Sequence, residues 1–452
     1  MRLILSGLCV FILSGCATYH AEPLSATETL ESFQARSLDQ PELREFLEAN
    51  LRSSMKDWPL KKWDFDLLTL AAFFYHPDLD IARAQWKIAN GAILTAGERP
   101  NPNLGFTPEY KASGSSAISP WLYGFTFDIP IETMGKRGRR IDQARHHAES
   151  MQSNIAITAW QVRSRLRTAL VRYETAKKNA EILKEELSLQ QSYVRFLESD
   201  QSVASVSLPD RLQAEIGLHQ NQMGLADAER QVEEAKVQVA ESLAVPVSGL
   251  DTDKIVWDRR PELGLSESEI RELALTKRPD LVGALAEYAA SQSALQLEIA
   301  RQYPDLHIGP GYTWDQGQNK WSAGVTLTLP VLNHNQGPIA EARARREESR
   351  ARFVVLQEKI IFETERALAG YKSALGKWKT ARQLLETQRH QNHLLKSQLG
   401  TGETSRLALL NSQLALKTTE LSYSDAEANL NLAFGALEDA MMAPLLVQSD
   451  ES

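Results

Sequence analysis

The sequence predicts a mainly α-helical α+β fold in which one unit occurs twice in tandem: helix, strand, strand and a very long helical hairpin. The segment from Trp121 to Ile141 returns 200 residues later, from Trp321 to Ile339, with tryptophan, glycine, threonine and proline at matching positions. Each copy alternates apolar with small or polar residues, as a strand does, and then passes through a glycine into a long helical pattern. A repeat of this size decides the architecture before any local assignment is made.

The N-terminus has the pattern of a lipoprotein signal peptide over residues 1–15. Arg2 precedes an apolar stretch, 3–13, that is too short to span a membrane. Leu13-Ser14-Gly15-Cys16 resembles a bacterial lipobox, in which cleavage before the cysteine exposes it for acylation. An ordinary signal peptide with a chance cysteine is the alternative. Because Ala17 resembles the residue at this position in lipoproteins sorted outward, we expect lipidation at Cys16 and anchoring in the outer membrane.

Composition and motifs exclude several classes of protein. A net charge of -8 argues against a globally basic nucleic-acid binder. Both cysteines, Cys9 and Cys16, lie at the N-terminus, so neither a disulfide framework nor a cysteine metal site is expected in the body of the chain. The sequence contains no nucleophile motif, phosphate loop or nucleotide fingerprint, so we expect no enzyme and no cofactor. His390 and His393 could share a metal ion, but no carboxylate nearby in the sequence completes a set, and a solvated helix face is expected instead.

The first repeat is assigned to residues 64–246. It follows a polar, acidic lead, 16–63, which we expect to be a tether with one or two short helices. Two strands are predicted, at about 103–111 and 121–130, and a long helical hairpin over 135–244. From about 135 to 199 the chain has no proline, which allows a helix of roughly 100 Å.

The second repeat is assigned to residues 266–440, after an irregular linker over 247–265. Ser266 with Glu269 predicts a capping box at its start. Its strands are predicted at about 305–314 and 320–330, and its helical hairpin at 338–440, with a break from Gly400 to Gly402. A short acidic tail, 441–452, ends the chain.

The strands predict a barrel wall between lipid and water, because each has one apolar face and one small or polar face. Four strands cannot close a barrel, and an open sheet edge cannot face lipid, so the chain must oligomerise. Two copies would give eight strands and a filled interior, whereas three would give twelve strands and a water-filled bore. The residues expected to face lipid are Leu104, Phe106, Tyr123, Phe125, Phe127, Ile308, Tyr312, Val325 and Leu327.

Basic residues gather where the long helices begin. They are Lys136, Arg137, Arg139 and Arg140 in the first repeat, and Arg343, Arg345 and Arg346 in the second. These cations could lie at the lipid phosphates of the inner leaflet, which is the interpretation we favour. The alternative is a solvated helix start, which the helix dipole disfavours slightly.

In its repeated strand–proline–glycine–long helix unit, the chain resembles the TolC-like outer-membrane factors over nearly everything after the signal. The runs HPDLDIARAQ, AGERPNPNL and PIETMGKRGRRI are most similar to the CzcC-like branch, which serves heavy-metal efflux. The resemblance implies a homotrimer with a twelve-stranded outer-membrane β-barrel continued by a periplasmic α-helical barrel, with the 247–265 linker at its equator. It also implies two partners, a periplasmic adaptor (membrane fusion) protein and a proton-driven inner-membrane transporter of the resistance-nodulation-division type.

The same resemblance assigns docking residues to the tips of the helical hairpins. The family's tip signature, a Leu-Gly pair followed by a serine and a leucine, is matched at Leu399, Gly400, Ser405 and Leu407. The first hairpin lacks the glycine, and its equivalent contacts are placed at Leu208 and Arg211. Plain turn chemistry is the alternative reading of Gly400.

Acidic residues near the tips could ring a closed entrance by symmetry and select cations. They are Glu198, Asp200, Asp210 and Glu403. Solubility of an exposed tip is the alternative explanation for them.

Two classes of function remain after these observations. The first is the passive exit duct of a tripartite efflux pump, for heavy-metal cations or alternatively for drugs or a polypeptide in type I secretion. The second is a periplasmic coiled-coil lipoprotein that acts as a scaffold. The alternating strand pairs favour the channel, because a scaffold needs none, but the sequence does not determine the cargo.

Overall fold

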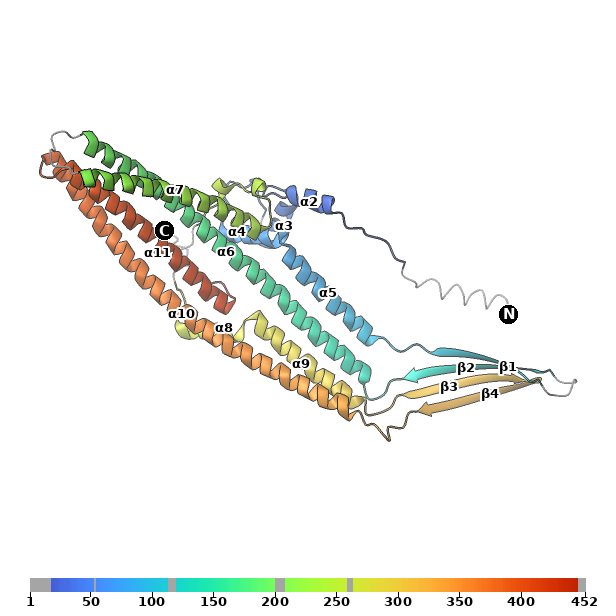
Figure 1. The fold of residues 1–452 in the computed structure, drawn as a ribbon. Helices are drawn as coiled ribbons and strands as arrows, with labels where there is room; N and C mark the ends of the chain where they lie inside the picture. Colours follow the sequence, from blue (N-terminus) through green and yellow to red (C-terminus); the bar gives the residue numbers. More distant parts are fainter. Residues whose placement is uncertain (1–17, 53, 113–118, 200–207, 258–262, 446–452) are drawn as a thin grey trace.

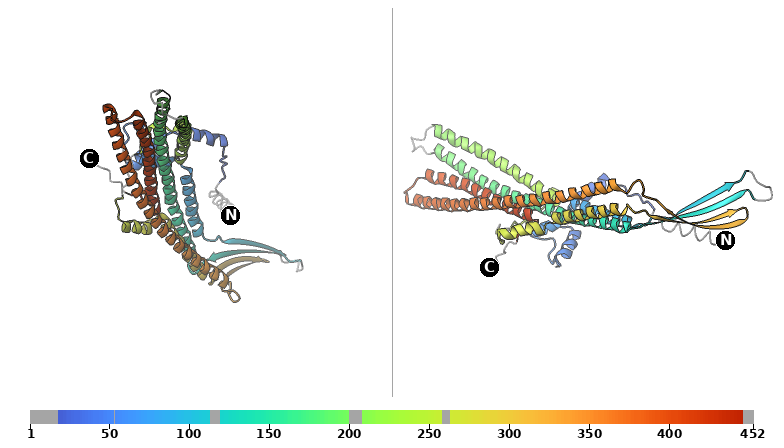
Figure 2. Two further views of the ribbon diagram at one scale, coloured as in Figure 1. Left: turned by 60° about the vertical axis from the view of Figure 1, so that its left-hand side comes forward. Right: turned by 90° about the horizontal axis from the view of Figure 1, so that it is seen from below.

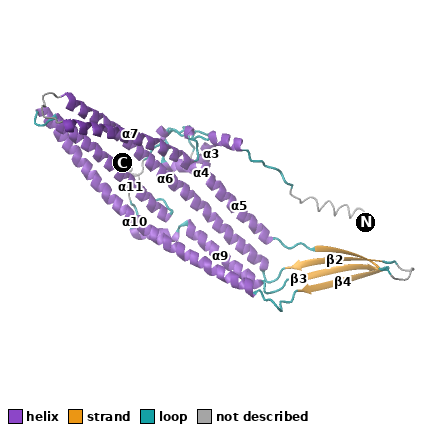
Figure 3. Cartoon of the chain, in the orientation of Figure 1, coloured by secondary structure: helices purple, strands orange, loops and turns teal. Residues whose placement is uncertain are grey.

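The chain is long and narrow in the computed structural model, which describes residues 18–52, 54–112, 119–199, 208–257 and 263–445. The strands lie at one end, and the far ends of the long helices, where the second helical hairpin turns, lie at the other (Figure 1; Figure 3). The described residues contain many helices and one four-stranded sheet. This arrangement confirms the predicted mainly helical α+β fold.

The N-terminal segment contributes α2 (Ala26–Gln34) and α3 (Pro41–Leu51). The part expected to be a tether packs against the body of the protein from Leu38 onward. Leu43, Leu47 and Trp63 are fully buried there, and Trp63 forms a parallel bridge with Ile255. The lead is polar on average, so the few apolar side chains that dock it are not evident from its composition.

The first repeat consists of six elements. They are α4 (Phe65–Tyr75), α5 (Pro77–Gly97), β1 (Asn103–Tyr110), β2 (Trp121–Ile131), α6 (Lys136–Ser199) and α7 (Leu208–Leu243). The Asp64 carboxylate accepts from the backbone N–H of Leu67 and caps α4. Pro77 starts α5, where the missing N–H has no cost. At 1.5 Å per residue, the 64 residues of α6 extend roughly 96 Å.

Two short 3₁₀ helices, η1 (Val247–Gly249) and η2 (Thr252–Lys254), lead toward the second repeat. That repeat contains α8 (Glu267–Thr276), α9 (Pro279–Ala300), β3 (Leu306–Asp315), β4 (Gln318–Leu327), α10 (Gln336–Thr401) and α11 (Arg406–Met441). The capping box predicted at Ser266 and Glu269 is present, with both reciprocal hydrogen bonds.

The hairpin between β3 and β4 is tighter than the sequence suggested. Asp315 pairs with Gln318, so the loop has two residues, Gln316 and Gly317, with φ angles of 54° and 94°. Positive φ at both positions is the requirement of a type I′ turn, which suits the twist of antiparallel strands. As a result β4 begins at Gln318 instead of 320, and it ends at Leu327, before Pro330, which has no N–H to donate to a ladder.

The two repeats pack alike. Val162, Leu170 and Tyr173 of α6 are buried in one core, and the residues at matching positions of α10, Ile360, Leu368 and Tyr371, are buried in a second core. Between them, α6 of the first repeat packs on α9 and α11 of the second. The two hairpins therefore run side by side. The sheet lies at the end of the molecule that is away from the hairpin tips (Figure 2).

Candidate functional site

Most of the apolar side chains of the sheet lie on one face; Leu122, opposite Glu109 and Asp315, is an exception. In the antiparallel register, Leu104 is opposite Phe127, Phe106 is opposite Phe125, and Ile308 is opposite Val325. Residues directly opposite each other share a face, and the pairing of β2 with β3 continues that face across all four strands. All nine residues predicted to face lipid lie on it: Leu104, Phe106, Tyr123, Phe125, Phe127, Ile308, Tyr312, Val325 and Leu327.

An aromatic cluster lies at the far end of this face; Tyr123 and Tyr312 were among the predicted site residues, but Tyr110, Trp121, Trp314 and Trp321 were not. The ring of Trp121 lies 5.1 Å from that of Tyr110, the ring of Tyr123 lies 5.8 Å from that of Trp314, and the ring of Trp321 lies 4.9 Å from that of Tyr312. Trp321 is 82% exposed in the single chain. Tryptophan and tyrosine at one end of an apolar band are typical of a membrane–water interface. Their place next to the strand turns was the sequence signal for this cluster.

The opposite face of the sheet carries small and polar residues. Its glycines lie close to their neighbours: a Cβ atom on Gly311 would lie 2.5 Å from the Ser322 hydroxyl oxygen, and one on Gly309 would lie 3.2 Å from the Phe127 carbonyl oxygen. Larger side chains at these positions would collide across the strands. The face is therefore lined by small groups, with a few charged side chains between them.

The sheet is open at both edges. The strand order is β1-β2-β3-β4, so among the described residues of the single chain β1 and β4 each have one edge without a ladder partner. Long unpaired edges are templates for pairing with another chain. The most direct way to satisfy both edges is for β4 of one copy to pair with β1 of the next.

The junction between sheet and helices is held by ion pairs, and this corrects our interpretation of its basic residues. Lys136 is buried, and its Nζ donates to Asp305 Oδ1 at 2.8 Å and to the Tyr303 carbonyl oxygen at 2.6 Å. Arg140 forms an ion pair with Glu132. These two cations are engaged by the protein itself and are not available to lipid phosphates, whereas Arg139 is exposed.

Asp305 is the centre of this junction. Partial burial by itself would raise the pKa of the Asp305 carboxyl group. Hydrogen bonds from Lys136 Nζ and the Thr133 backbone N–H outweigh that effect and lower its pKa below the ordinary value. The carboxylate thus stays ionised and joins the start of α6 to the start of β3.

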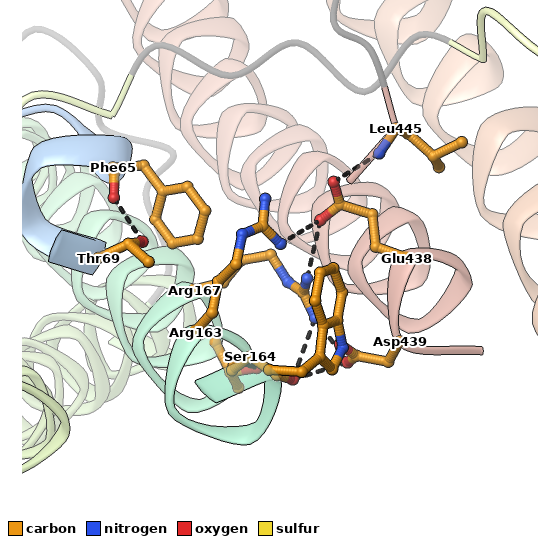
Figure 4. Close-up of polar contacts among 10 residues, drawn as sticks. Phe65, Thr69, Arg163, Ser164, Arg167, Glu438, Asp439 and Leu445 are labelled. Atoms are coloured by element: carbon orange, nitrogen blue, oxygen red, sulfur yellow. Dashed lines mark hydrogen bonds and ion pairs between the residues drawn. The ribbon is translucent and has the colours of Figure 1, made fainter. Parts of the chain in front are cut away.

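A buried charge cluster joins the two repeats at mid-length, and the sequence did not indicate it (Figure 4). Glu438 of α11 is completely buried, and its Oε2 accepts from Arg163 Nη1 at 3.2 Å and from Arg167 Nη1 at 2.8 Å. Arg167 Nη2 also donates to Asp439 Oδ2 at 2.6 Å. Both arginines lie on α6, so the cluster connects the first hairpin to the second. Each arginine is more than 270 residues away in sequence from the carboxylate that it binds, and no local pattern pairs them.

The tip of the second hairpin turns at Gly402, not at Gly400. Helix α10 continues through Gly400 to Thr401, and Gly402 has a left-handed φ of 79°. The N–H of Gly402 donates to the Leu399 carbonyl oxygen and that of Glu403 donates to the Gln398 carbonyl oxygen, which together form a Schellman motif. Only the residue that follows the last turn needs positive φ. A Cβ atom at Gly400 would meet nothing within 4 Å.

The other predicted tip residues differ in how accessible they are. The Ser405 hydroxyl accepts from the Ala408 N–H and caps α11. Leu407 packs against a small core of the first hairpin formed by Val194, Leu197 and Ala214, so it joins the two tips. Leu208 is 59% exposed and Arg211 is exposed at the start of α7. The structure therefore leaves Leu208, Arg211 and Gly400 exposed, whereas Leu399 and Leu407 are half-buried.

Some predicted positions fall outside the described residues. Cys16 and Asp200 are among them, so the structure says nothing of the lipid anchor or of that part of the acidic ring. Asp210 and Glu403 are exposed near the two tips. The ring at the entrance stays a prediction.

The described part of the chain has neither a metal-binding cluster nor a membrane-spanning helix. It contains no group of three or more histidine, cysteine, aspartate or glutamate side chains that could hold a metal ion, His390 and His393 included. None of its helices has an apolar stretch of membrane-spanning length.

Comparisons with known proteins bear on both repeats. A family model described as "Outer membrane efflux protein" matches residues 74–245 and 270–441, one match in each repeat. The pyoverdine export outer membrane protein OpmQ of Pseudomonas aeruginosa is 23% identical over 402 residues, which cover 82% of either chain. The cobalt-zinc-cadmium resistance protein CzcC of Cupriavidus metallidurans is 22% identical over 286 residues, covering 61% of this chain and 65% of CzcC.

Solved structures share the fold. The outer membrane protein VceC of Vibrio cholerae has a TM-score of 0.68 at 16% identity, covering 84% of this chain and 97% of VceC. The outer-membrane channel OprN has a TM-score of 0.69 at 15% identity, covering 95% of this chain and 99% of OprN. At these identities the likeness establishes the fold alone.

Proposed function

Because this chain belongs to the outer membrane efflux protein family, we propose that it is the outer-membrane exit duct of a tripartite, proton-driven efflux pump. In this proposal three copies close a twelve-stranded barrel in the outer membrane, and their helical hairpins continue the duct through the periplasm. The hairpin tips meet a periplasmic adaptor protein, which links the duct to an inner-membrane transporter of the resistance-nodulation-division type. The chain conducts its cargo passively and needs no cofactor.

The observation that carries this proposal is the division of the sheet into two faces. One face is apolar from Leu104 to Leu327, and the other is lined mainly by glycine, threonine and serine, with a few charged side chains between them. An open four-stranded sheet of this kind is stable in lipid only when further copies satisfy its edges. The test is whether the chain restores export when it is expressed in cells that lack its gene, combined with membrane fractionation. A chain that stays in the periplasm, or that does not restore export, would contradict the proposal.

Heavy-metal cations are the cargo that we propose, and a small organic molecule is the second candidate. The run that resembles the CzcC-like branch and the relative named for cobalt, zinc and cadmium resistance support the first. The relative named for pyoverdine export supports the second, and it aligns over more of this chain. Growth of a deletion strain on graded zinc, cobalt and cadmium, compared with growth on siderophores and drugs, separates the two.

The lipid anchor at Cys16 gives the first prediction. We expect the mature chain to begin at Cys16 and to carry acyl chains, since LSGC follows a short apolar stretch. Mass spectrometry of the N-terminal peptide tests this, and an unmodified Cys16 or cleavage elsewhere would disprove it. Cys16→Ala is expected to reduce export less than damage to the sheet, because the sheet inserts by itself.

The second prediction concerns docking at the tips. Gly400→Asp is expected to abolish export, because it places a charge on the surface that the adaptor is proposed to contact. Trimers and outer-membrane localisation are expected to persist, because the new side chain points into open space and leaves the turn at Gly402 intact. Gly400→Ala is the matched control and is expected to keep export. Leu208→Asp tests the first hairpin in the same way. Leu407→Asp does not distinguish docking from folding, because Leu407 also packs between the two hairpins.

Docking is measured by cross-linking from the tip to the adaptor together with the export assay. Suppressors of Gly400→Asp are expected in the adaptor's own tip. Full export by both Gly400→Asp and Leu208→Asp would mean that the partner contacts the duct somewhere else.

A further inference from the structure

The polar face of the sheet carries an excess of negative charge. Its charged side chains, besides His307, are the carboxylates Glu109, Asp128 and Asp315 and the ammonium group of Lys320. Three carboxylates against one ammonium leave an excess of two negative charges per chain. The other positions on this face are mainly glycine, threonine and serine. In a closed ring of copies such a lining attracts cations, because rings of carboxylates in a pore favour them.

One histidine lies among these carboxylates. His307, near the start of β3, places Nδ1 2.8 Å from Asp128 Oδ1 on the neighbouring strand β2. An ionised carboxylate only accepts hydrogen bonds, so Nδ1 carries the proton when the ring is neutral. The lone pair is then on Nε2, for which the described residues provide no hydrogen-bond partner.

This arrangement is the usual second shell of a metal-binding histidine. A histidine that binds a metal through one nitrogen commonly donates its other N–H to a carboxylate, which fixes the ring and makes the ligand more basic. The His307 ring is 38% exposed and the Asp128 side chain is 45% exposed, so a hydrated ion can reach the pair. Gly309 and Gly324 add no side chains beside it.

The other carboxylates at the two ends of β3 are already paired. Asp305, which directly precedes β3, is bound by Lys136, and Asp315 at the far end of β3 is bound by Lys320 at 2.7 Å. Thr326 lies opposite His307 on β4. For a cation attracted to the polar face near the start of β3, the imidazole of His307 is therefore the available nitrogen ligand.

We propose that the His307–Asp128 pair is a transient contact site for divalent transition-metal ions on the polar face of the sheet, with Nε2 of His307 as the protein ligand. This proposal rests on the proposed function, in which the polar face lines a water-filled bore. Imidazole suits zinc, copper and nickel, whereas magnesium and calcium prefer oxygen. A single protein ligand completed by water binds weakly, and a conducting path requires sites that release the ion again.

The experiment records currents through the purified full-length chain in planar lipid bilayers, first without metal and then with Zn²⁺ or Mg²⁺. About 1 mM Zn²⁺ is expected to reduce the current by about half, as a weak site in the path would, and the same Mg²⁺ concentration is expected to leave it nearly unchanged. His307→Gln, which can still donate to Asp128, is expected to remove the Zn²⁺ effect while keeping the current.

His146→Gln is the matched control, because His146 Nδ1 also contacts a carboxylate, Glu149 Oε2 at 3.0 Å, but lies on α6 outside the sheet. It is expected to keep the Zn²⁺ effect. A current that Zn²⁺ does not alter in the wild type, or a Zn²⁺ effect that persists in His307→Gln, would overturn the proposed site and leave the channel standing. The absence of any current would overturn the proposed function, and this site with it.

Discussion

Replacing Phe125 and Phe127 by arginine together is expected to abolish outer-membrane insertion and trimer formation. Both side chains lie on the apolar face of the sheet, and both are substantially exposed in the single chain. In the proposed barrel they meet hydrocarbon. Arginine at the bilayer midplane costs about 2–4 kcal/mol per residue, so two of them in each of three copies outweigh the stability of an ordinary fold. The readout is the yield of heat-modifiable trimer in outer-membrane fractions.

The matched control for this experiment is Thr107→Arg on the opposite face. Thr107 is exposed and pairs with Gly124, so an arginine there has space and would point into the proposed bore. It is expected to leave insertion intact and to alter only conduction. Normal trimer yield from the double arginine variant would show that Phe125 and Phe127 do not face lipid.

The sequence predicted the fold well because the repeat and the two periodicities are local signals. The two-residue period of apolar side chains placed Phe125 and Ile308 on one face of the sheet. The absence of proline from 135 to 199 predicted α6. The capping box at Ser266 was predictable for the same reason. Each of these features is determined by residues within a few positions of one another.

Features determined by residues far apart in sequence were not predictable. Lys136 was interpreted as a lipid contact because its partner, Asp305, lies 169 residues away. Leu407 was assigned to a free tip, although the core that it joins belongs to the other hairpin. Gly400 and Gly402 both suited a turn, and only the helix geometry distinguishes them.

The buried charge cluster is the most consequential feature of this kind, and Glu438→Gln is expected to destabilise the helical body strongly. The change removes the charge that Arg163 and Arg167 share and leaves two buried guanidinium groups with Asp439 as the remaining carboxylate of the cluster. Breaking a buried ion pair from one side typically costs about 3–5 kcal/mol, because the other charge stays desolvated.

Thermal unfolding of the purified protein, followed by circular dichroism of its helices, measures this effect. The matched control is Glu348→Gln on α10, which breaks the pair with Arg352, where both side chains are more than half exposed. Exposed pairs of this kind contribute less than about 1 kcal/mol, so the control is expected to unfold close to the wild type. Because Glu438 and Arg167 lie on α11 and α6, the loss in Glu438→Gln should loosen one hairpin from the other before either hairpin unfolds. Equal unfolding temperatures for the two variants would show that the cluster does not hold the repeats together.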